Sequence, residues 1–250
     1  MTITITTSNV NGIRAAKRKG IEQWAAKNTP DVWCMQEVRA PQNEIDPIFD
    51  EFGFEYATAG RIADQSGLDR MNEIGLLSAL PVIDKRYGLP GLAEDVDSGR
   101  WIEADVKTPQ GYTVTVVCVY VHAGNTDDPE KMKQKYRFLD TMLVRMGQLR
   151  DEAAHGGRQA VLCGDFNIAH TPLDIKNAKA NEKHAGFLPE ERAYVDKWLG
   201  ELEFVDVMRS LCGDIQGPYT WWGQRGRAFD NNAGWRIDYQ FATPELAETA

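Results

Sequence analysis

The sequence predicts an α/β fold with two packed layers of β-sheet at its core and helices outside. Three observations support this prediction. Strand candidates outnumber helix candidates along the 250 residues. Hairpin-like stretches alternate with helical crossovers, which favours mixed sheets over an all-parallel sheet. The chain also contains no repeat, no low-complexity stretch and no long linker, so residues 1–250 are expected to form a single domain.

The strand candidates are rich in Val, Ile, Thr or aromatic residues, and most are bounded by Gly, Pro or Asn. The first begins near the N-terminus, where apolar and polar residues alternate with the period of a strand. Two later candidates follow each other closely enough to form a hairpin. The full set is residues 2–8, 31–36, 74–78, 101–107, 112–121, 159–164 and 235–242.

Three segments have the pattern of helices, namely residues 15–27, 129–152 and 189–199. In the second segment, apolar side chains recur at spacings of three and four and form one apolar face. The third begins with Pro189, which suits the first helical turn, and two glutamates follow near the positive end of the helix dipole. The apolar face of the second segment consists of Met132, Tyr136, Leu139, Leu143 and Met146.

The composition is that of an ordinary globular protein, with 42% hydrophobic and 26% charged residues. No apolar run approaches the roughly 18 to 20 residues needed to span a bilayer, so no membrane partner is expected. The N-terminus lacks the basic and apolar blocks of a secretory signal. The four cysteines have neither the spacing of a disulfide framework nor that of a zinc site. Buried, reduced thiols are therefore expected, which favours a cytoplasmic protein: Cys34, Cys118, Cys163 and Cys212.

The net charge of −9 at first argues against a nucleic-acid partner, because phosphates bind basic surfaces. Positive charge is nevertheless concentrated locally after the first strand, after the segment around Asp165, and beside a group of tryptophans. Each concentration is also compatible with an ordinary solvated face. The three groups are Arg14, Lys17, Arg18 and Lys19; Lys176, Lys179 and Lys183; and Arg225, Arg227 and Arg236 beside Trp221, Trp222 and Trp235.

Polar side chains able to bind a metal ion or a phosphate repeatedly follow an apolar strand. Each taken alone has a structural explanation, since Asn11-Gly12 suits a turn and Asp165 could cap one. Because the strands of one sheet can bring such ends together, the recurrence favours a shared site. The side chains in question are Asn9 and Asn11, Glu37, Tyr120 and His122, and Asp165 and Asn167.

The chemistry of this set narrows the reaction class. The sequence has no G-x-S-x-G element, no ordered Ser-His-Asp set and no Gly-rich phosphate loop. Carboxylates and amides are hard oxygen ligands, which suit Mg²⁺ or Mn²⁺ with water and a substrate phosphate completing the shell. Metal-assisted hydrolysis of a phosphate ester is therefore the reaction that the residues favour.

Four ordered motifs make the prediction more specific. Together they resemble the exonuclease III and apurinic/apyrimidinic endonuclease family, and the resemblance covers essentially the whole chain. Further matches are Asp174, Asn177, Asn181 and the run Ala185-Gly-Phe-Leu-Pro-Glu-Glu-Arg192. The resemblance implies a four-layered α/β sandwich, made of two packed mixed β-sheets flanked by helices. The four motifs are Asn9-Val-Asn-Gly-Ile-Arg14, Met35-Gln-Glu-Val-Arg39, Cys163-Gly-Asp-Phe-Asn-Ile-Ala-His170 and Gly234-Trp-Arg-Ile-Asp-Tyr239.

The resemblance also implies a function and a division of roles. It implies a metal-dependent, monomeric DNA-repair enzyme, which hydrolyses the phosphodiester of double-stranded DNA at abasic sites and 3′ ends. Glu37 resembles the principal metal-binding carboxylate, with Asn9 and Asn11 beside it. Asp165 resembles the acid that orients and deprotonates the attacking water, and Asn167 the amide that holds that acid and the phosphate. Two further catalytic positions match, Tyr120 as a phosphate-contacting phenol and Asp238 as the carboxylate that orients the family's histidine.

The same resemblance assigns residues that contact DNA. Trp221 and Trp235 match the apolar wall around an extrahelical abasic sugar, a pocket too small for an intact base. The tryptophans could equally belong to the core. Asn181 matches a phosphate-pocket residue, and four basic residues are expected to contact the DNA backbone. These four are Arg14, Lys17, Arg39 and Lys176.

The chain departs from the family pattern at its end. The family finishes with an Asp-His pair on a final strand, whereas this chain stops 12 residues after Asp238. The last segment opens like a helix at Thr243 and shows no Gly stop. The resemblance therefore implies a C-terminally truncated form of an enzyme of roughly 270 to 290 residues, badly impaired in catalysis and stability. Near-normal turnover on abasic DNA in Mg²⁺ would contradict this. None of the four histidines replaces the family's: His122, His155, His170 and His184.

Smaller departures affect details of strand contact, and two other functions stay open. Ala123 stands where the family usually has an amide, and residues 70–73 replace a Gly-rich turn. The first alternative function is a phosphodiesterase of the same fold that acts on a small molecule or lipid. The second is a non-catalytic, abasic-DNA-binding remnant, which predicts salt-sensitive binding without cleavage.

Overall fold

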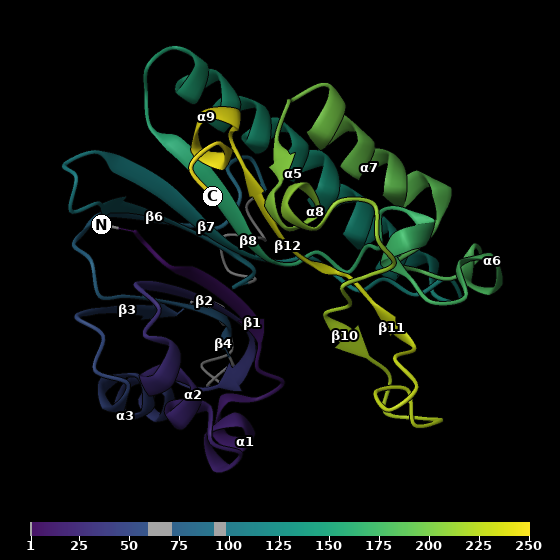
Figure 1. The fold of residues 1–250 in the computed structure, drawn as a ribbon, viewed down its shortest axis with the longest axis horizontal. Helices are drawn as coiled ribbons and strands as arrows, with labels where there is room; N and C mark the ends of the chain where they lie inside the picture. Colours follow the sequence, from purple (N-terminus) through teal and green to yellow (C-terminus); the bar gives the residue numbers. More distant parts are fainter. Residues whose placement is uncertain (1, 60–71, 93–98) are drawn as a thin grey trace.

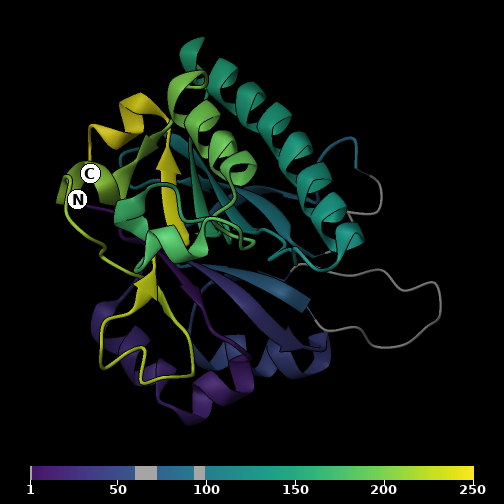
Figure 2. The ribbon, with the colours of Figure 1, turned by 90° about the vertical axis from the view of Figure 1, so that its right-hand side faces the viewer.

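The computed structural model describes residues 2–59, 72–92 and 99–250. Its two large β-sheets face each other, and helices cover the outer face of each (Figures 1 and 2). The layers run from α1, α2 and α3, through the first sheet and the second sheet, to α5 and α7. The predicted α/β fold with two packed mixed sheets flanked by helices is therefore confirmed. Residues 70–73 were expected to replace a Gly-rich turn, and residues 70 and 71 of this segment lie outside the described residues.

The first sheet has the strand order β1-β2-β4-β3. Its strands are β1 (Ile5–Asn9), β2 (Val32–Ala40), β3 (Tyr56–Ala59) and β4 (Asn72–Ser78). Strand β1 runs parallel to β2, and the other pairs are antiparallel. Helices α1 (Ile13–Arg18), α2 (Ile21–Asn28) and α3 (Gln42–Glu51) cover its outer face. An aromatic-rich core that includes Trp33 and Phe49 holds these helices to the sheet.

The second sheet has the strand order β5-β6-β7-β8-β12-β9. Its strands are β5 (Val82–Tyr87), β6 (Trp101–Lys107), β7 (Thr113–Tyr120), β8 (Gln159–Asp165), β9 (Val205–Asp206) and β12 (Asp238–Ala242). Strands β7 and β8 are parallel, because the helical crossover α5 (Pro129–Ala154) connects them. Helix α7 (Pro189–Gly200) packs beside α5.

The space between the sheets is filled from both sides by strand residues that face inward. Val32 and Cys34 of the first sheet lie in one apolar cluster with Val116 and Cys118 of the second. Strands with apolar residues on both faces, such as β7, are covered by a sheet on one face and by helices on the other. The rigid core therefore fixes the ends of β1, β7, β8 and β12 relative to one another.

Short elements lie between and after the main strands. They are the 3₁₀-helix η1 (Pro172–Asp174), α6 (Ala178–Asn181), α8 (Val207–Cys212) and α9 (Pro244–Ala247). The strands β10 (Trp221–Trp222) and β11 (Gly234–Trp235) form a two-stranded arm that projects from the body of the second sheet (Figure 1). The helix expected after Thr243 is present as α9, with Pro244 in its first turn.

Three predicted elements differ from the observed ones. The predicted helix 15–27 divides into α1 and α2, because the chain turns at Gly20 with a positive φ of 91°. The predicted strand 235–242 divides into β11 and β12. The predicted strand 31–36 continues to Ala40 through a bulge. Strands β3 and β5 and helices α3 and α8 were not predicted. Strand β3 has only four residues, and charged residues interrupt the apolar patterns of the other three elements.

The burial of the cysteines and of one arginine can be compared with the predictions. Cys34, Cys118 and Cys163 are buried free thiols as expected, whereas Cys212 is only half-buried. Arg236 was assigned to a basic surface, and this prediction is wrong, because its side chain is 1% exposed. Within residues 2–59, 72–92 and 99–250, the helices are all too short or too polar for a transmembrane span.

Candidate active site

A hollow of about 750 Å³ lies where the ends of the two sheets meet the aromatic arm. Its walls come from β1, β2, β8, β12 and the segment around β10. Six of the residues predicted from the sequence line it, and they come from segments up to 229 positions apart (238 − 9). The six are Asn9, Asn11, Glu37, Asp165, Trp221 and Asp238.

Asp165 ends β8 and is almost fully buried. Gly164 precedes it because β7 comes very close there: a Cβ at this position would lie 1.9 Å from the carbonyl oxygen of Val119. Each carboxylate oxygen accepts one hydrogen bond. The side-chain amide of Asn9 donates to Oδ2 at 3.0 Å, and the backbone N–H of Asn167 donates to Oδ1 at 2.9 Å. Burial raises the pKa of Asp165 to about 6, although these two hydrogen bonds oppose the shift.

Glu37 lies in the bulge of β2, between Gln36 and Ala40. Its backbone has a positive φ of 53°, and its carbonyl oxygen accepts a 2.7 Å hydrogen bond from Gly12 N–H. The Tyr120 hydroxyl donates to Glu37 Oε1 at 2.8 Å. Burial and the neighbouring Glu37 charge both raise the pKa of Tyr120, so the phenol keeps its proton. The bulge therefore turns a strand side chain toward the other sheet, where β7 ends.

Asn11 and Arg39 complete this side of the hollow. The backbone N–H of Asn11 donates to Asn9 Oδ1 at 3.0 Å, which makes a local turn at the end of β1. Arg39 Nη1 donates to Asn11 Oδ1 at 3.0 Å, and Nη2 is 2.6 Å from Glu37 Oε2. Arg39 was predicted to contact the DNA backbone. The structure places its guanidinium against the predicted metal ligands, where it neutralises part of the Glu37 charge.

Asp238 begins β12, directly opposite Asp165 in the register of the two antiparallel strands. Its backbone N–H donates to the Thr220 hydroxyl at 3.1 Å. Burial raises the pKa of Asp238, and the nearby Asp165 charge raises it further. Among the described residues, its Oδ1 atom is buried without a hydrogen-bond partner. This oxygen can therefore accept a hydrogen bond from a further donor.

The histidines lie elsewhere. His170 Nε2 is 2.7 Å from Asp196 Oδ1, and His155 Nδ1 contacts the carbonyl oxygen of Asp151. His122 was grouped with the residues that follow strands, but its ring packs edge-on against Phe138. Burial lowers the pKa of His122 to about 3, so it is neutral at physiological pH.

The residues expected to contact the DNA backbone are dispersed. Arg14 pairs with Glu44 at 2.9 Å on the outside of the first sheet, and Lys17 pairs with Glu22 and Glu51. Lys176 is exposed after η1. The Asn181 side-chain amide donates to the carbonyl oxygen of Asn177 at 3.0 Å. None of these four lines the hollow.

The aromatic arm forms the opposite wall. Trp221 lines the hollow with 46% of its surface exposed and meets Trp235 edge-on, with 6.2 Å between ring centroids. Trp235 packs closely over Gly186, since a Cβ added there would come within 3.1 Å of its ring. Trp33, Trp101 and Trp198 are core residues. Of the two predicted pocket tryptophans, Trp221 lines the hollow, whereas Trp235 lies behind it and packs against a small buried cluster that includes Phe187 and Ile237.

Two residues beside the site were missed from the sequence. The Arg100 guanidinium lies over the Tyr120 ring at 4.5 Å and donates to the Tyr120 carbonyl oxygen at 3.3 Å. Lys135 is fully buried behind Asn167. A signal for Lys135 existed, because it falls three residues after Met132 on the apolar face of the predicted helix. Arg100, at the start of a strand, offered no such signal.

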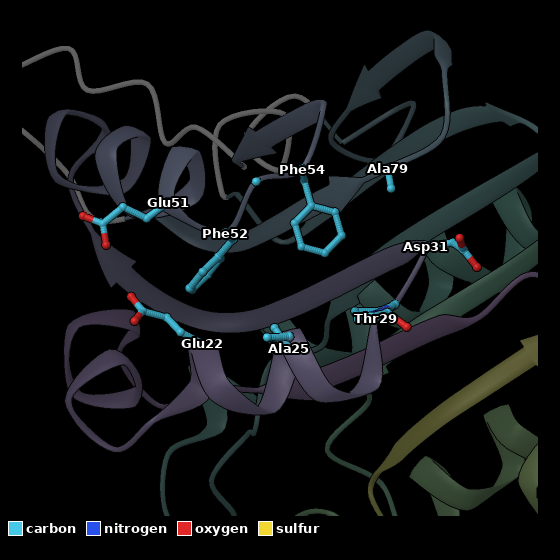
Figure 3. Close-up of a pocket in the computed structure, with 11 residues that line it drawn as sticks. Glu22, Ala25, Thr29, Asp31, Glu51, Phe52, Phe54 and Ala79 are labelled. Atoms are coloured by element: carbon cyan, nitrogen blue, oxygen red, sulfur yellow. The ribbon is translucent and has the colours of Figure 1, made fainter.

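A second hollow of about 670 Å³ lies on the outside of the first sheet, between α2 and the segment that follows α3 (Figure 3). Phe52 and Phe54 form part of its wall, with Glu22 and Glu51 at one end and Asp31 at the other. None of the predicted site residues lines it. Its chemistry is acidic and aromatic, without the mixture of amides and carboxylates found in the first hollow.

Comparison with known proteins agrees with this geometry. The sequence profile described as the Endonuclease/Exonuclease/phosphatase family matches residues 6–250. The chain belongs to this family. It is 31% identical over 241 residues to an exodeoxyribonuclease from Bacillus subtilis, covering 96% of this chain and 88% of that protein. It is also 31% identical over 238 residues to the DNA repair nuclease APEX1 of Danio rerio, covering 94% and 71% of the two chains. The resemblance recognised from the ordered motifs is therefore confirmed.

Solved structures of family members superpose over nearly the whole chain. An AP endonuclease from Archaeoglobus fulgidus has a TM-score of 0.82 and 29% identity, covering 99% of this chain and 89% of that one. The 3′ phosphatase NExo from Neisseria, solved bound to a product DNA hairpin, has a TM-score of 0.82 and 26% identity with the same coverage. The fold is thus shared with nucleases that act on abasic sites and on DNA ends.

Nucleases of this family generally depend on a divalent metal ion, and the donor set of the first hollow fits one. In the described parts of the chain, no three His, Cys, Asp or Glu side chains converge tightly enough to form a cage around a metal ion. Mg²⁺ does not need such a cage, because it keeps several waters and binds through one or two carboxylates and the substrate phosphate. Glu37 with the amide oxygens of Asn9 and Asn11 supplies donors of that kind.

Proposed function

We propose that this chain is a Mg²⁺- or Mn²⁺-dependent DNA-repair phosphodiesterase of the exodeoxyribonuclease III and AP endonuclease type. Its substrate is double-stranded DNA, cleaved at abasic sites and at 3′ ends. The observation that carries the proposal is the buried Asp165 carboxylate. It is held by Asn9 and Asn167 in a hollow that has Glu37 on one side and Trp221 on the opposite wall. The names of the Bacillus, zebrafish and Archaeoglobus relatives support this choice of substrate.

The roles follow from the contacts. Glu37, Asn9 and Asn11 would hold the cation, which when bound neutralises charge that develops on the phosphate. Asp165, which accepts a hydrogen bond from Asn9 of that group, takes a proton from the attacking water, since its burial raises its pKa to about 6. Asn167 fixes the orientation of Asp165 through its backbone N–H. The Tyr120 hydroxyl, protonated and close to Glu37, donates to the scissile phosphate or to the leaving oxygen.

The DNA contacts are proposed from the charged and aromatic residues at the rim. Trp221 and Trp235 enclose the abasic sugar, while Arg14, Lys17, Lys176 and Asn181 contact the backbone. Arg39 lies closest to the metal ligands and contacts the phosphate next to the cleaved bond. The basic contacts offset the net charge of −9, because local charge governs phosphate binding. The three buried thiols support a cytoplasmic location. The proposed enzyme acts as a monomer.

Substrate choice tests the proposal. Labelled duplexes with one abasic analogue, with intact bases or with a recessed 3′ end are compared with bis-p-nitrophenyl phosphate. We expect incision at the abasic position and trimming of 3′ ends in Mg²⁺, no cleavage in EDTA, and recovery when Mg²⁺ or Mn²⁺ is added. Faster turnover of the small diester than of abasic DNA would favour a small-molecule enzyme. Salt-sensitive binding to abasic DNA without cleavage at any metal concentration would exclude hydrolysis.

Replacement of Trp221 tests the sugar pocket. Trp221→Ala removes an exposed aromatic side chain from the wall of the hollow. We expect kcat/KM for abasic incision to fall about tenfold, the scale of a lost apolar contact in a specificity pocket. Removal of 3′-terminal nucleotides from intact duplex is expected to change less. The matched control is Phe229→Ala, because Phe229 is 71% exposed on the same arm and does not line the hollow. Equal losses in both variants would argue against a specific pocket role.

A further inference from the structure

A buried ion pair lies directly behind residues 165–168, the segment with Asp165 and Asn167 that we call the catalytic loop. Lys135 of α5 and Glu191 of α7 are both fully buried, and Lys135 Nζ is 2.5 Å from Glu191 Oε1. The same ammonium donates to the carbonyl oxygen of Asn167 at 2.9 Å and to that of Ala123 at 3.1 Å. All three of its N–H donors are therefore used. Each contact is made to a different segment of the chain.

Glu191 extends the same network. Its Oε2 atom accepts hydrogen bonds from the backbone N–H groups of Gly186 at 2.6 Å and Leu188 at 3.0 Å. Gly186 in turn lies against the catalytic loop and Trp235: a Cβ added there would meet both the Asn167 carbonyl oxygen and the Trp235 ring at 3.1 Å. One ion pair thus connects the segments that follow β7 and β8 with the segment that supports Trp235.

The contact with Asn167 controls the orientation of Asp165. Asn167 has a positive φ of 51°, a conformation that a residue with a side chain rarely adopts unless its surroundings hold it. Its N–H donates to Asp165 Oδ1, its side-chain amide donates to the Val121 carbonyl oxygen at 2.9 Å, and its own carbonyl accepts from Lys135. The peptide groups on both sides of Asn167 are therefore fixed. Without Lys135, the second of them has no charged partner.

Stability alone gives a weak reason for this pair. Burial of two charges carries a large desolvation penalty, and apolar or neutral replacements of buried pairs often leave stability unchanged. Burial also lowers the pKa of Lys135, which Glu191 opposes. The ammonium group fixes two carbonyl oxygens and one carboxylate oxygen around a single nitrogen atom. Only the charged side chain can make these three contacts.

We propose that Lys135 is a positioning residue, which with Glu191 holds the Asn167 peptide and thereby aims the Asp165 carboxylate. The inference rests on the proposed function, because it gives Asp165 its catalytic role. Lys135 itself does not touch the substrate. It acts through Asn167, so its loss is expected to alter turnover and leave DNA binding nearly unchanged.

The test compares Lys135→Met/Glu191→Gln with Glu191→Gln alone. The double variant has no buried charge and keeps an acceptor for Gly186 and Leu188, so its Tm is expected to stay close to that of the wild type. Its kcat for incision is expected to fall about tenfold to a hundredfold, the scale of a small misplacement of a catalytic group, with little change in KM. Glu191→Gln keeps the Lys135 contact with Asn167 but leaves Lys135 unpaired. It is expected to be less stable than the double variant and yet more active.

Hydrogen exchange gives a readout that does not depend on activity. The Asn167 amide is expected to lose protection in the double variant, whereas the amide of Leu162 in the middle of β8 keeps its protection. Lys133→Met, an exposed lysine on the same helix, is the control and is expected to behave like the wild type. If the wild-type chain does not cleave DNA, the proposed function is wrong. Exchange of the Asn167 amide would still test whether Lys135 holds the Asn167 peptide in place.

The proposal is overturned if the two variants lose activity in the same order as they lose stability. It is also overturned if the double variant retains the wild-type kcat and a protected Asn167 amide. A double variant that does not fold leaves Glu191→Gln as the decisive comparison, because a large loss of kcat there contradicts the role of the Lys135 contact.

Discussion

Replacement of Asp165 by asparagine is expected to lower kcat for DNA cleavage by about 10²- to 10⁴-fold, the usual contribution of a general base. Asparagine has nearly the same shape and keeps an oxygen for one of the hydrogen bonds from Asn9 and Asn167, but it cannot take a proton from water. The dissociation constant for abasic duplex is expected to change little. Single-turnover incision and equilibrium binding of the same duplex measure the two effects.

Stability distinguishes a lost base from a damaged fold in this variant. Burial raises the pKa of Asp165 to about 6 in the metal-free protein, above its ordinary value of 3.8. The folded state therefore holds this proton more tightly than the unfolded state, and stability falls as pH rises through the interval between the two values. Asp165→Asn removes that loss but places its NH2 group against one of the two donors, so the two effects offset each other. The metal-free variant is therefore expected to stay close to the stability of the wild type at pH 7.5. Asp151→Asn, an exposed carboxylate on α5, is the control for both measurements. A cleavage rate within about threefold of the wild type would show that Asp165 is not the base.

Replacement of Arg236 by methionine is expected to produce the largest loss of stability, about 3 to 5 kcal/mol in the free energy of unfolding. Arg236 Nε donates to Asp174 Oδ1 at 2.7 Å, and Nη1 donates to Asp206 Oδ1 at 3.0 Å. The guanidinium also lies over the Tyr239 ring at 4.5 Å. The variant leaves Asp206 without its buried partner, while Asp174 keeps its ion pair with Arg209 and its hydrogen bonds from Thr171. Urea denaturation measures the change, and Tm is expected to fall by about 10 °C.

The pH dependence of this loss has a definite sign. Burial tends to raise the pKa of Asp174, but its hydrogen bonds with Arg236 and other partners outweigh that effect and hold it below the ordinary value. The stability that Asp174 contributes is therefore present at neutral pH and is lost as pH falls through the lowered pKa. The deficit of Arg236→Met is expected to be greatest near pH 7 and to shrink below about pH 4, where the unpaired carboxyl can take a proton.

Arg227→Met is the matched control for Arg236→Met. Arg227 is an exposed arginine on the same arm, paired with Asp230 at 3.1 Å, and exposed pairs contribute only about 0 to 1 kcal/mol. A loss in Arg236→Met no greater than in this control would show that the buried network adds nothing to stability. Because Arg236 lies between Trp235 and Asp238, its loss is also expected to reduce incision.

Much of the site could be predicted because its residues follow strands. Asn9, Tyr120 and Asp165 each end an apolar strand that is visible in the sequence, and strand ends in packed sheets converge. Glu37 was expected to follow the strand 31–36 and does line the hollow. The bulge that turns it inward was not predicted, because it depends on β4 and Tyr120. A bulge of this kind leaves no pattern in the local sequence.

Charge gave the weakest predictions. Arg236, Arg39 and Lys17 are equally basic in the sequence. In the structure, however, Arg236 is buried, Arg39 contacts Glu37 and Asn11, and Lys17 pairs with surface glutamates. Distant partners set two of these environments, since Asp174 is 62 positions from Arg236 and Glu51 is 34 positions from Lys17. Arg39 instead pairs with its near neighbour Glu37. Lys135 shows the same effect, since its partner Glu191 is 56 positions distant.

The α/β class, the main strands and helices, and the family could all be predicted from the sequence alone. These properties depend on residue identity and on periodicity, which are local and can be read along the chain. Tertiary structure alone decided that Glu37 turns inward, that Arg236 is buried and that Lys135 supports Asn167. The physical reason is that desolvation and ion pairing act between groups that are close in space. The environment of a charged side chain therefore depends on partners that only folding brings near it.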